Sequence, residues 1–156
     1  MDTHDLALFL HLLGVVSMFS GIAVAALAQA RARTRDDPAE VALTLGFART
    51  GVLLAGPGVL LTLAAGGWLM SLDDLGFDTG WLATAVGLFL VSMLLGALGG
   101  RRPRLARELA ERLAASGDSV TPDLRRLLDD RASLVLNIAS ALTMLAVLWL
   151  MVSKPS

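Results

Sequence analysis

The chain contains no cysteine, and this absence excludes disulfide bonds, thiolate metal ligands and thiol nucleophiles. Charged residues are also scarce, because Asp, Glu, Lys and Arg make up only 17% of the 156 residues, against roughly 25% in soluble domains. The net charge of −1 provides no overall basic field to attract nucleic acid. The sequence also has no phosphate-binding loop, His-Glu metal motif or serine triad. We therefore expect no nucleic-acid partner and find no motif of a known enzyme class.

Apolar residues dominate instead, at 55% of the chain with a mean hydropathy of +0.68. A helix that crosses the hydrocarbon core of a bilayer needs about 20 apolar residues. Four segments meet that requirement, namely residues 6–30, 50–70, 80–99 and 132–152. The sequence thus predicts an all-α, polytopic membrane protein, in which residues 1–156 form one integral domain built as a four-transmembrane-helix bundle.

Charge patterning predicts how these segments cross the membrane. The arginines fall in the connections 31–49 and 100–131, and the one lysine, Lys154, follows the last segment. Cytoplasmic connections carry the excess of Lys and Arg. We therefore expect both connections in the cytoplasm and both termini on the outer side of the membrane.

The tryptophans predict the same topology independently. Trp68 ends the second segment, Trp81 begins the third and Trp149 ends the fourth. Indole rings favour the membrane interface, so these three residues are expected to be anchors on the outer side. Arg49 stands at the other end of the second segment and is expected to anchor the cytoplasmic side, with its long stem extended toward water.

Local signals place several helix ends in the connections. Asp37 followed by Pro38, with Glu40 completing a capping box, predicts that the second helix begins well before the membrane. Thr121 and Pro122 repeat this pattern, and we expect the fourth helix to start there and run unbroken into the bilayer. Between the third and fourth segments, residues 101–116 predict an additional amphipathic cytoplasmic helix, which either lies along the anionic leaflet or packs on the end of the bundle.

Small residues indicate how the helices pack, because helices in lipid associate through close backbone approach. Ser17 and Gly21, like Gly96 and Gly100, are four residues apart. We expect these positions to form packing faces within one chain rather than a dimer interface. Pro57 removes one helical hydrogen bond, so a bend is expected in the second helix.

Polar side chains at membrane depth are costly and are candidates for function. They are His11, Arg49, Thr62, Ser92, Asn137 and Thr143. No predicted span contains a carboxylate, which argues against proton-relay and cation-coupled carriers. Asn137 is expected to form an interhelical hydrogen bond.

His11 has two interpretations. A neutral imidazole near the interface can simply bond to a neighbouring helix. It can also ligate a metal, with Met70, Met144 or Met151 as the soft partners, and imidazole with thioether suits haem iron or copper.

The motifs "LHLLGVVSMFSGI", "GPGVLLTLAAGGWLM", "GWL" and "VLWLMVSKP" resemble those of a family of bacterial four-helix proteins described as predicted integral membrane proteins of unknown function. In pattern, that family is similar to the wider CopD-like copper-resistance proteins and HemJ-like protoporphyrinogen oxidases. This resemblance implies a first-helix histidine that ligates haem or metal, a role that would fall to His11. HemJ-like proteins also carry a lysine in a later helix, whereas Lys154 lies beyond the last span, so oxidase chemistry is not implied.

The first functional hypothesis is therefore a non-catalytic accessory or scaffold subunit without a resident cofactor, surrounded by lipid and by protein partners of a membrane complex. The alternative hypothesis is a redox protein that binds haem b or handles copper through His11. The sequence indicates neither a substrate nor an oligomeric state.

Overall fold

The computed structural model describes residues 2–154, and all regular secondary structure in that range is helical. Its helices are α1 (Thr3–Ala32), α2 (Pro38–Leu72), α3 (Gly80–Gly99), α4 (Arg101–Ser116), α5 (Pro122–Leu128) and α6 (Arg131–Ser153). Four helical stretches are long and apolar enough to cross a membrane by length and composition. The prediction of an all-α protein with four membrane-spanning helices is confirmed.

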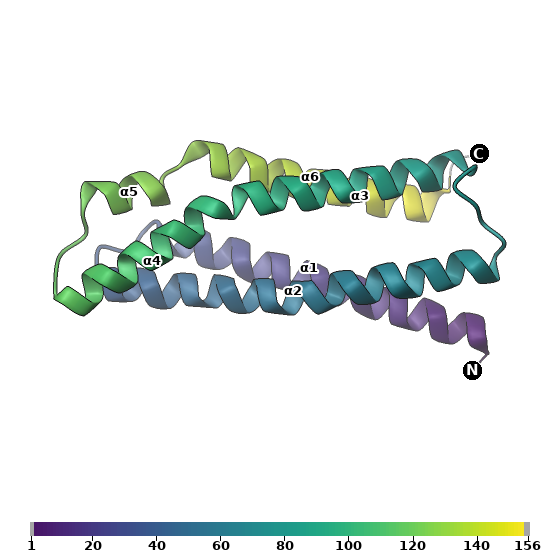
Figure 1. Ribbon diagram of the computed structural model, residues 1–156, viewed down its shortest axis with the longest axis horizontal. Coiled ribbons are helices and arrows are strands. Elements are labelled where there is room, and N and C mark those ends of the chain that lie inside the picture. Colours follow the sequence, from purple (N-terminus) through teal and green to yellow (C-terminus); the bar gives the residue numbers. More distant parts are fainter. Residues whose placement is uncertain (1, 155–156) are drawn as a thin grey trace. The chain divides into compact units, whose positions relative to one another are not determined.

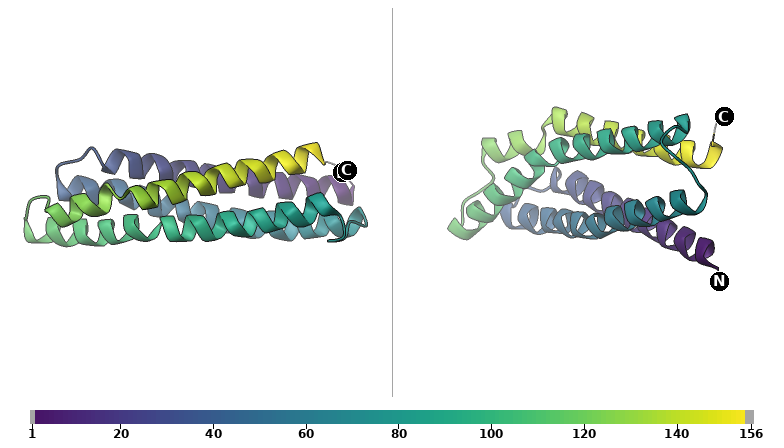
Figure 2. Two further views of the ribbon diagram at one scale, coloured as in Figure 1. Left: turned by 90° about the horizontal axis from the view of Figure 1, so that it is seen from above. Right: turned by 45° about the vertical axis from the view of Figure 1, so that its right-hand side comes forward.

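The helices are organised in two compact units. The first contains α1, α2 and residues 110–120, and the second contains residues 76–109 and the chain from Thr121 onward. Within each unit two long helices run antiparallel side by side, α1 with α2 and α3 with α6 (Figures 1 and 2). Each unit is therefore built on one antiparallel pair of long helices.

Small residues form the contact between α1 and α2. The buried positions recur at intervals of mostly three and four residues, namely Ala7, Gly14, Met18, Gly21, Ala25, Ala28 and Ala32 on α1. Their counterparts on α2 are Pro38, Val41, Leu45, Ala48, Gly51, Gly58, Thr62 and Ala65. This spacing keeps one seam facing the partner helix, and the small side chains bring the two backbones close.

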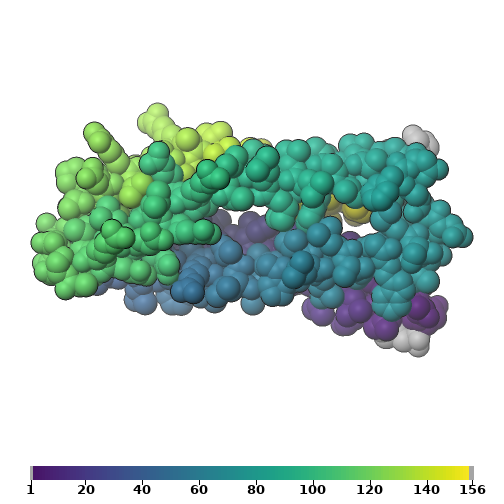
Figure 3. All heavy atoms as spheres, in the orientation of Figure 1, coloured from purple at the N-terminus to yellow at the C-terminus, as the bar shows by residue number. Residues whose placement is uncertain are grey.

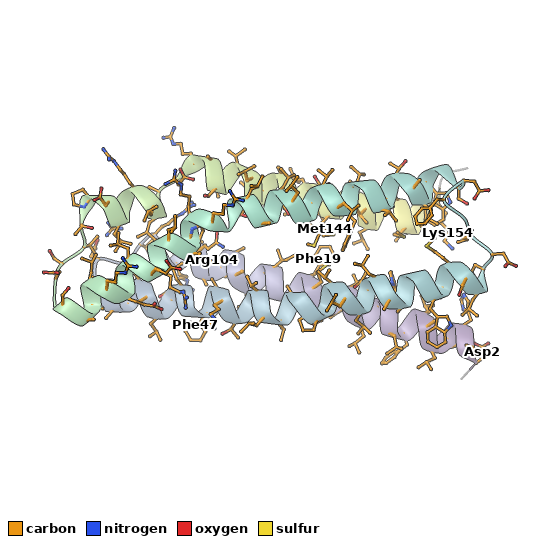
Figure 4. The ribbon with its side chains drawn as sticks, in the orientation of Figure 1. Asp2, Phe19, Phe47, Arg104, Met144 and Lys154 are labelled. Carbon is orange, nitrogen blue, oxygen red and sulfur yellow. The ribbon has the colours of Figure 1, made fainter. Side chains whose placement is uncertain are left out.

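Bulky apolar side chains lie on the outside of the same pair. Phe47 points away from α2 with 59% of its surface exposed (Figure 4). Figure 3 shows the atoms of α2, coloured blue, at the surface in that view. In water such a surface would oppose folding. In a bilayer it is the surface that lipid chains cover, which agrees with four membrane-crossing helices.

The beginning of α2 follows the sequence prediction. The side chain of Asp37 accepts a hydrogen bond from the backbone N–H of Ala39 at 2.8 Å, and Pro38 is the first helical residue. The carboxylate of Glu40 accepts from Arg35 at 3.3 Å and not from the backbone N–H of Asp37, so the predicted capping box is wrong. The helix continues through Pro57 to Leu72, and the bend expected at Pro57 stays a prediction.

The prediction of one unbroken fourth helix is wrong. Thr121 caps the start of α5, where its hydroxyl accepts from the N–H of Leu124 at 3.3 Å, but α5 ends at Leu128. A second helix, α6, then begins because the carboxylate of Asp130 accepts from the N–H of Ser133 at 2.8 Å. Asp at this position satisfies an N–H that has no partner within the helix, so it starts a new helix instead of continuing the old one.

Residues 101–116 are helical, and the existence of an additional amphipathic helix on the membrane or on the bundle stays a prediction. Gly117 ends it with a left-handed φ of 73°. The N–H of Asp118 donates to the carbonyl of Leu113 at 3.0 Å, and that of Gly117 donates to Ala114 at 3.3 Å. These two bonds form a Schellman motif, which satisfies carbonyls at the end of a helix.

Candidate functional site around His11

His11 bonds to the backbone of the neighbouring helix. Its Nδ1 lies 3.0 Å from the carbonyl oxygen of Thr62 on α2. A carbonyl oxygen only accepts, so Nδ1 carries the hydrogen and donates. In the neutral ring this tautomer leaves the lone pair on Nε2. The half-buried imidazole is thus held at one nitrogen and retains an acceptor at the other.

Close backbone approach brings Thr62 within reach of α1. A Cβ at Gly14 would stand 2.6 Å from the Thr62 nitrogen, and a Cβ at Gly58 would stand 2.6 Å from the Met18 nitrogen. The two backbones can approach each other this closely only because these glycines have no side chain. Thr62 itself is buried, and its hydroxyl donates to the carbonyl of Gly58 on its own helix at 2.8 Å. Only its backbone carbonyl is directed to His11.

Gly66 provides the space for the imidazole. A Cβ at this position would stand 3.1 Å from Nδ1 and 3.2 Å from Cε1 of His11. Because Gly66 lies one turn beyond Thr62 on α2, the ring lies against a stretch of backbone that has no side chain. Gly66 is therefore a positioning residue for His11.

The other histidine lies at the end of the same pair. Nε2 of His4 is 3.3 Å from Oδ1 of Asp73, and both side chains are exposed. Asp2, at the start of α1 (Figure 4), accepts from the N–H of Asp5 at 2.8 Å and caps the helix. Among residues 2–154 no group of three or more His, Cys, Asp or Glu side chains is arranged to hold a metal ion. His11 would therefore be the sole imidazole ligand at its site.

Two serines form the corresponding polar contact in the second unit. The hydroxyl of Ser92 on α3 donates to the carbonyl of Ser140 on α6 at 2.9 Å, and the hydroxyl of Ser140 donates to the carbonyl of Ser92 at 2.8 Å. Ser92 is only 1% exposed. The bonds are reciprocal, so the hydroxyl of each serine has a backbone carbonyl of the neighbouring helix as its acceptor. Gly96 leaves room for Ser140, whose Oγ would lie 3.3 Å from a Cβ there.

The remaining predicted residues occupy different surroundings. Gly21 is buried, and a Cβ there would meet the carbonyl of Gly51. Asn137 lies against Gly99, where its Oδ1 would clash with a Cβ. Pro57 and Arg49 are exposed on α2, and neither belongs to the seam. Thr143 donates to the carbonyl of Ala139 on its own helix at 2.8 Å.

The tryptophans stand near helix ends, as the anchor interpretation requires. Trp68 lies four residues before the end of α2, Trp81 is the second residue of α3, and Trp149 lies four residues before the end of α6. Trp68 and Trp149 are exposed, and Trp81 is half-buried.

Gly66 and Ser140 were missed by sequence reasoning. A comparison of depth in the membrane could have found them. In an antiparallel pair of helices, residues in contact lie at the same distance from the same membrane face. His11 lies about one turn after the start of the first predicted span, and Gly66 about one turn before the end of the second. Ser92 lies about two turns before the end of the third span, and Ser140 about two turns after the start of the fourth. The structure brings together Thr62 with His11 and Ser140 with Ser92.

The fold and the polar contacts define a class, a multi-pass helical membrane protein whose hairpins are held by small residues and by isolated hydrogen bonds. Residues 5–155 match the model of the family described as "Predicted integral membrane protein (DUF2269)", and the chain belongs to that family. No curated protein matches the chain, and no solved structure matches it. The resemblance to CopD-like and HemJ-like proteins stays a prediction.

Proposed function

We propose that this protein is a non-catalytic membrane subunit, an accessory or scaffold component of a larger assembly. The observation that carries the proposal is the use of its polar groups at membrane depth. His11 donates to Thr62, and Ser92 and Ser140 bond to each other. These groups join helices, so they act as interhelical hydrogen bonds. Such groups stabilise a framework and do not by themselves form a reaction centre.

The outer surface supports the same proposal. Bulky apolar side chains are exposed along every long helix, including Phe9 on α1, Leu60 on α2, Leu90 on α3 and Leu142 on α6. In a membrane these faces meet either lipid or the helices of a partner protein. A scaffold subunit uses such faces to hold its neighbours.

The proposed location is the cytoplasmic (inner) membrane of a bacterium, with both termini outside. The arginine-rich connections and the tryptophans at the opposite helix ends support this orientation.

One observation favours an alternative, in which His11 ligates haem b or copper. Metal-ligating histidines almost always donate their second ring N–H to a carbonyl or carboxylate, and His11 donates its Nδ1–H to Thr62. Its Nε2 therefore fits the role of one ligand. Met70 would supply a soft second donor from the same pair, since it lies one turn beyond Gly66 on α2. When bound, haem or copper would supply one-electron transfer.

An absorption spectrum with metal analysis of the purified protein separates the two functions. We expect the native protein to carry no stoichiometric haem or copper. His11→Asn and His11→Gln should remain folded, because an amide can donate to the Thr62 carbonyl and such bonds contribute about 0.6 kcal/mol on average in membranes. A stoichiometric cofactor that disappears in folded His11→Gln protein would establish the alternative and refute the cofactor-free scaffold.

A further inference from the structure

One end of the second unit carries three exposed arginines, Arg101, Arg102 and Arg131. Arg101 lies 20 residues beyond Trp81, which is about 30 Å of helix. Arg131 lies 18 residues before Trp149, which is about 27 Å. The hydrocarbon core of a bilayer is about 30 Å thick. With the indole rings at one interface, these guanidinium groups reach the headgroups of the opposite leaflet.

Two backbone hydrogen bonds connect the end of α3 with the start of α4. The N–H of Gly100 donates to Gly96 at 2.9 Å, and that of Arg104 donates to Gly100 at 3.3 Å. Arg101 and Arg102 therefore lie in the first turn after the end of α3.

The packing of α3 on α6 brings Arg101 and Arg102 to the same end of the second unit as Arg131. A Cβ at Gly99 would stand 3.2 Å from the Leu136 side chain and would meet Asn137. Arg101 and Arg102 thus emerge beside the first turns of α6, the helix that begins at Arg131.

These arginines are available for an external anion. Arg101, Arg102 and Arg131 are exposed, and no carboxylate among residues 2–154 lies within ion-pair distance of them. The nearest acids in sequence to Arg131 are Asp129, which is exposed, and Asp130, whose carboxylate accepts from the N–H of Ser133 in the α6 cap. Guanidinium groups match the planar, bidentate geometry of phosphate oxygens.

The adjoining surface is apolar, which distinguishes a lipid from a free phosphate ion. Leu94 on α3 and Leu134, Val135 and Ile138 on α6 are exposed within two turns of the arginines. A ligand that matches both the arginines and the apolar residues has an anionic phosphodiester for the former and acyl chains for the latter.

We infer that Arg101, Arg102 and Arg131 bind the headgroup of an anionic phospholipid in the leaflet at this end of α3 and α6. The acyl chains lie along the exposed apolar residues of the same helices. The site depends on these helices crossing the bilayer and does not depend on the scaffold function or on a cofactor at His11.

The test is lipid titration of the full chain in neutral detergent, with bound lipid counted by native mass spectrometry. Phosphatidylglycerol is the anionic probe and phosphatidylcholine the zwitterionic one. Each arginine near an anionic surface contributes about fivefold in affinity, so Arg101→Gln/Arg102→Gln should weaken phosphatidylglycerol binding by roughly 30-fold. Arg101→Lys/Arg102→Lys should bind more tightly than the glutamine variant because the charge is kept, and less tightly than the native protein because lysine lacks the bidentate geometry.

The matched control is Arg112→Gln/Arg126→Gln, which removes the same charge from exposed positions and should bind phosphatidylglycerol like the native protein. Far-UV circular dichroism checks that all variants remain folded. Native-like binding by folded Arg101→Gln/Arg102→Gln protein, equal binding of phosphatidylcholine, or an equal loss in the control would overturn the inference. Equal competition by glycerol 3-phosphate, which has no acyl chains, would show a free-anion site and also overturn it.

Discussion

At the scale of single residues, Gly66 shows how a missing side chain defines the surroundings of His11. The neighbouring Gly67 has no atom within 4 Å of where its Cβ would stand, whereas at Gly66 the imidazole lies 3.1 Å away. Two adjacent glycines in one helix therefore have different roles. One accommodates a ring and the other only lowers helix propensity.

This contrast predicts opposite behaviour of two alanine variants. Gly67→Ala should stabilise the protein by about 0.4–1 kcal/mol, because alanine favours the helix and restricts the unfolded chain. Gly66→Ala should be about 1 kcal/mol less stable than Gly67→Ala, because displaced His11 loses most of a bond of about 0.6 kcal/mol and some packing. Unfolding in sodium dodecyl sulfate mixed micelles, followed by circular dichroism, measures both.

The control for this prediction is the same pair of variants in a His11→Ala background. There the ring is absent, so the two alanine substitutions should have equal effects. A persistent difference would mean that Gly66 matters for a reason other than His11.

At the scale of elements, the seam between α1 and α2 depends on glycines that touch backbone. A Cβ at Gly21 would stand 2.6 Å from the nitrogen of Ala55, and backbone atoms cannot rotate away as a side chain can. Gly21→Ala should therefore push the helices apart and destabilise the protein by about 1–3 kcal/mol. The matched control is Gly46→Ala, which meets nothing within 4 Å and should be stabilising. Equal unfolding midpoints for the two variants would contradict the close backbone packing of α1 on α2 at Gly21.

The serine pair is the corresponding feature between α3 and α6. Ser92→Ala and Ser140→Ala should each destabilise by about 1 kcal/mol, within the range up to about 1.7 kcal/mol measured for such bonds. The double variant should cost less than the two single variants together, because both remove parts of the same reciprocal contact. A double-mutant cycle in mixed micelles measures the coupling, and strict additivity would show that the serines act independently.

At the scale of the whole molecule, the distribution of charge predicts the topology. The chain has no cysteine, so a cysteine introduced at Thr3 or at Ser119 is a unique label. On intact cells an impermeant thiol reagent should modify the Thr3→Cys variant and leave the Ser119→Cys variant unmodified, because arginine-rich connections stay in the cytoplasm. Permeabilised cells should label both. Equal labelling of the two variants in sealed cells would contradict the predicted orientation of the chain in the membrane.

The sequence by itself determined the number of spans and most helix ends. Hydropathy over about 20 residues reports whether a segment prefers lipid, and it needs no knowledge of neighbouring helices. Caps are equally local, since Asp37 and Thr121 bond to N–H groups two or three residues away. Asp130 shows the limit of this reasoning. The same sequence pattern fits both the interior of a long helix and a cap, and only the folded backbone shows that a new helix begins there.

Only the tertiary structure decided which helices pair and at which register. The acceptor for His11 is a backbone carbonyl of Thr62, and every residue has such a carbonyl, so no residue type in the sequence marks it. The reciprocal bonds of Ser92 and Ser140 likewise end on carbonyls. Their formation depends on how closely two helices approach and at what offset. For α1 and α2 that approach is set by the glycines and alanines of the seam together. His11 could therefore be recognised in the sequence as a candidate, whereas its hydrogen-bond acceptor could be identified only from the folded structure.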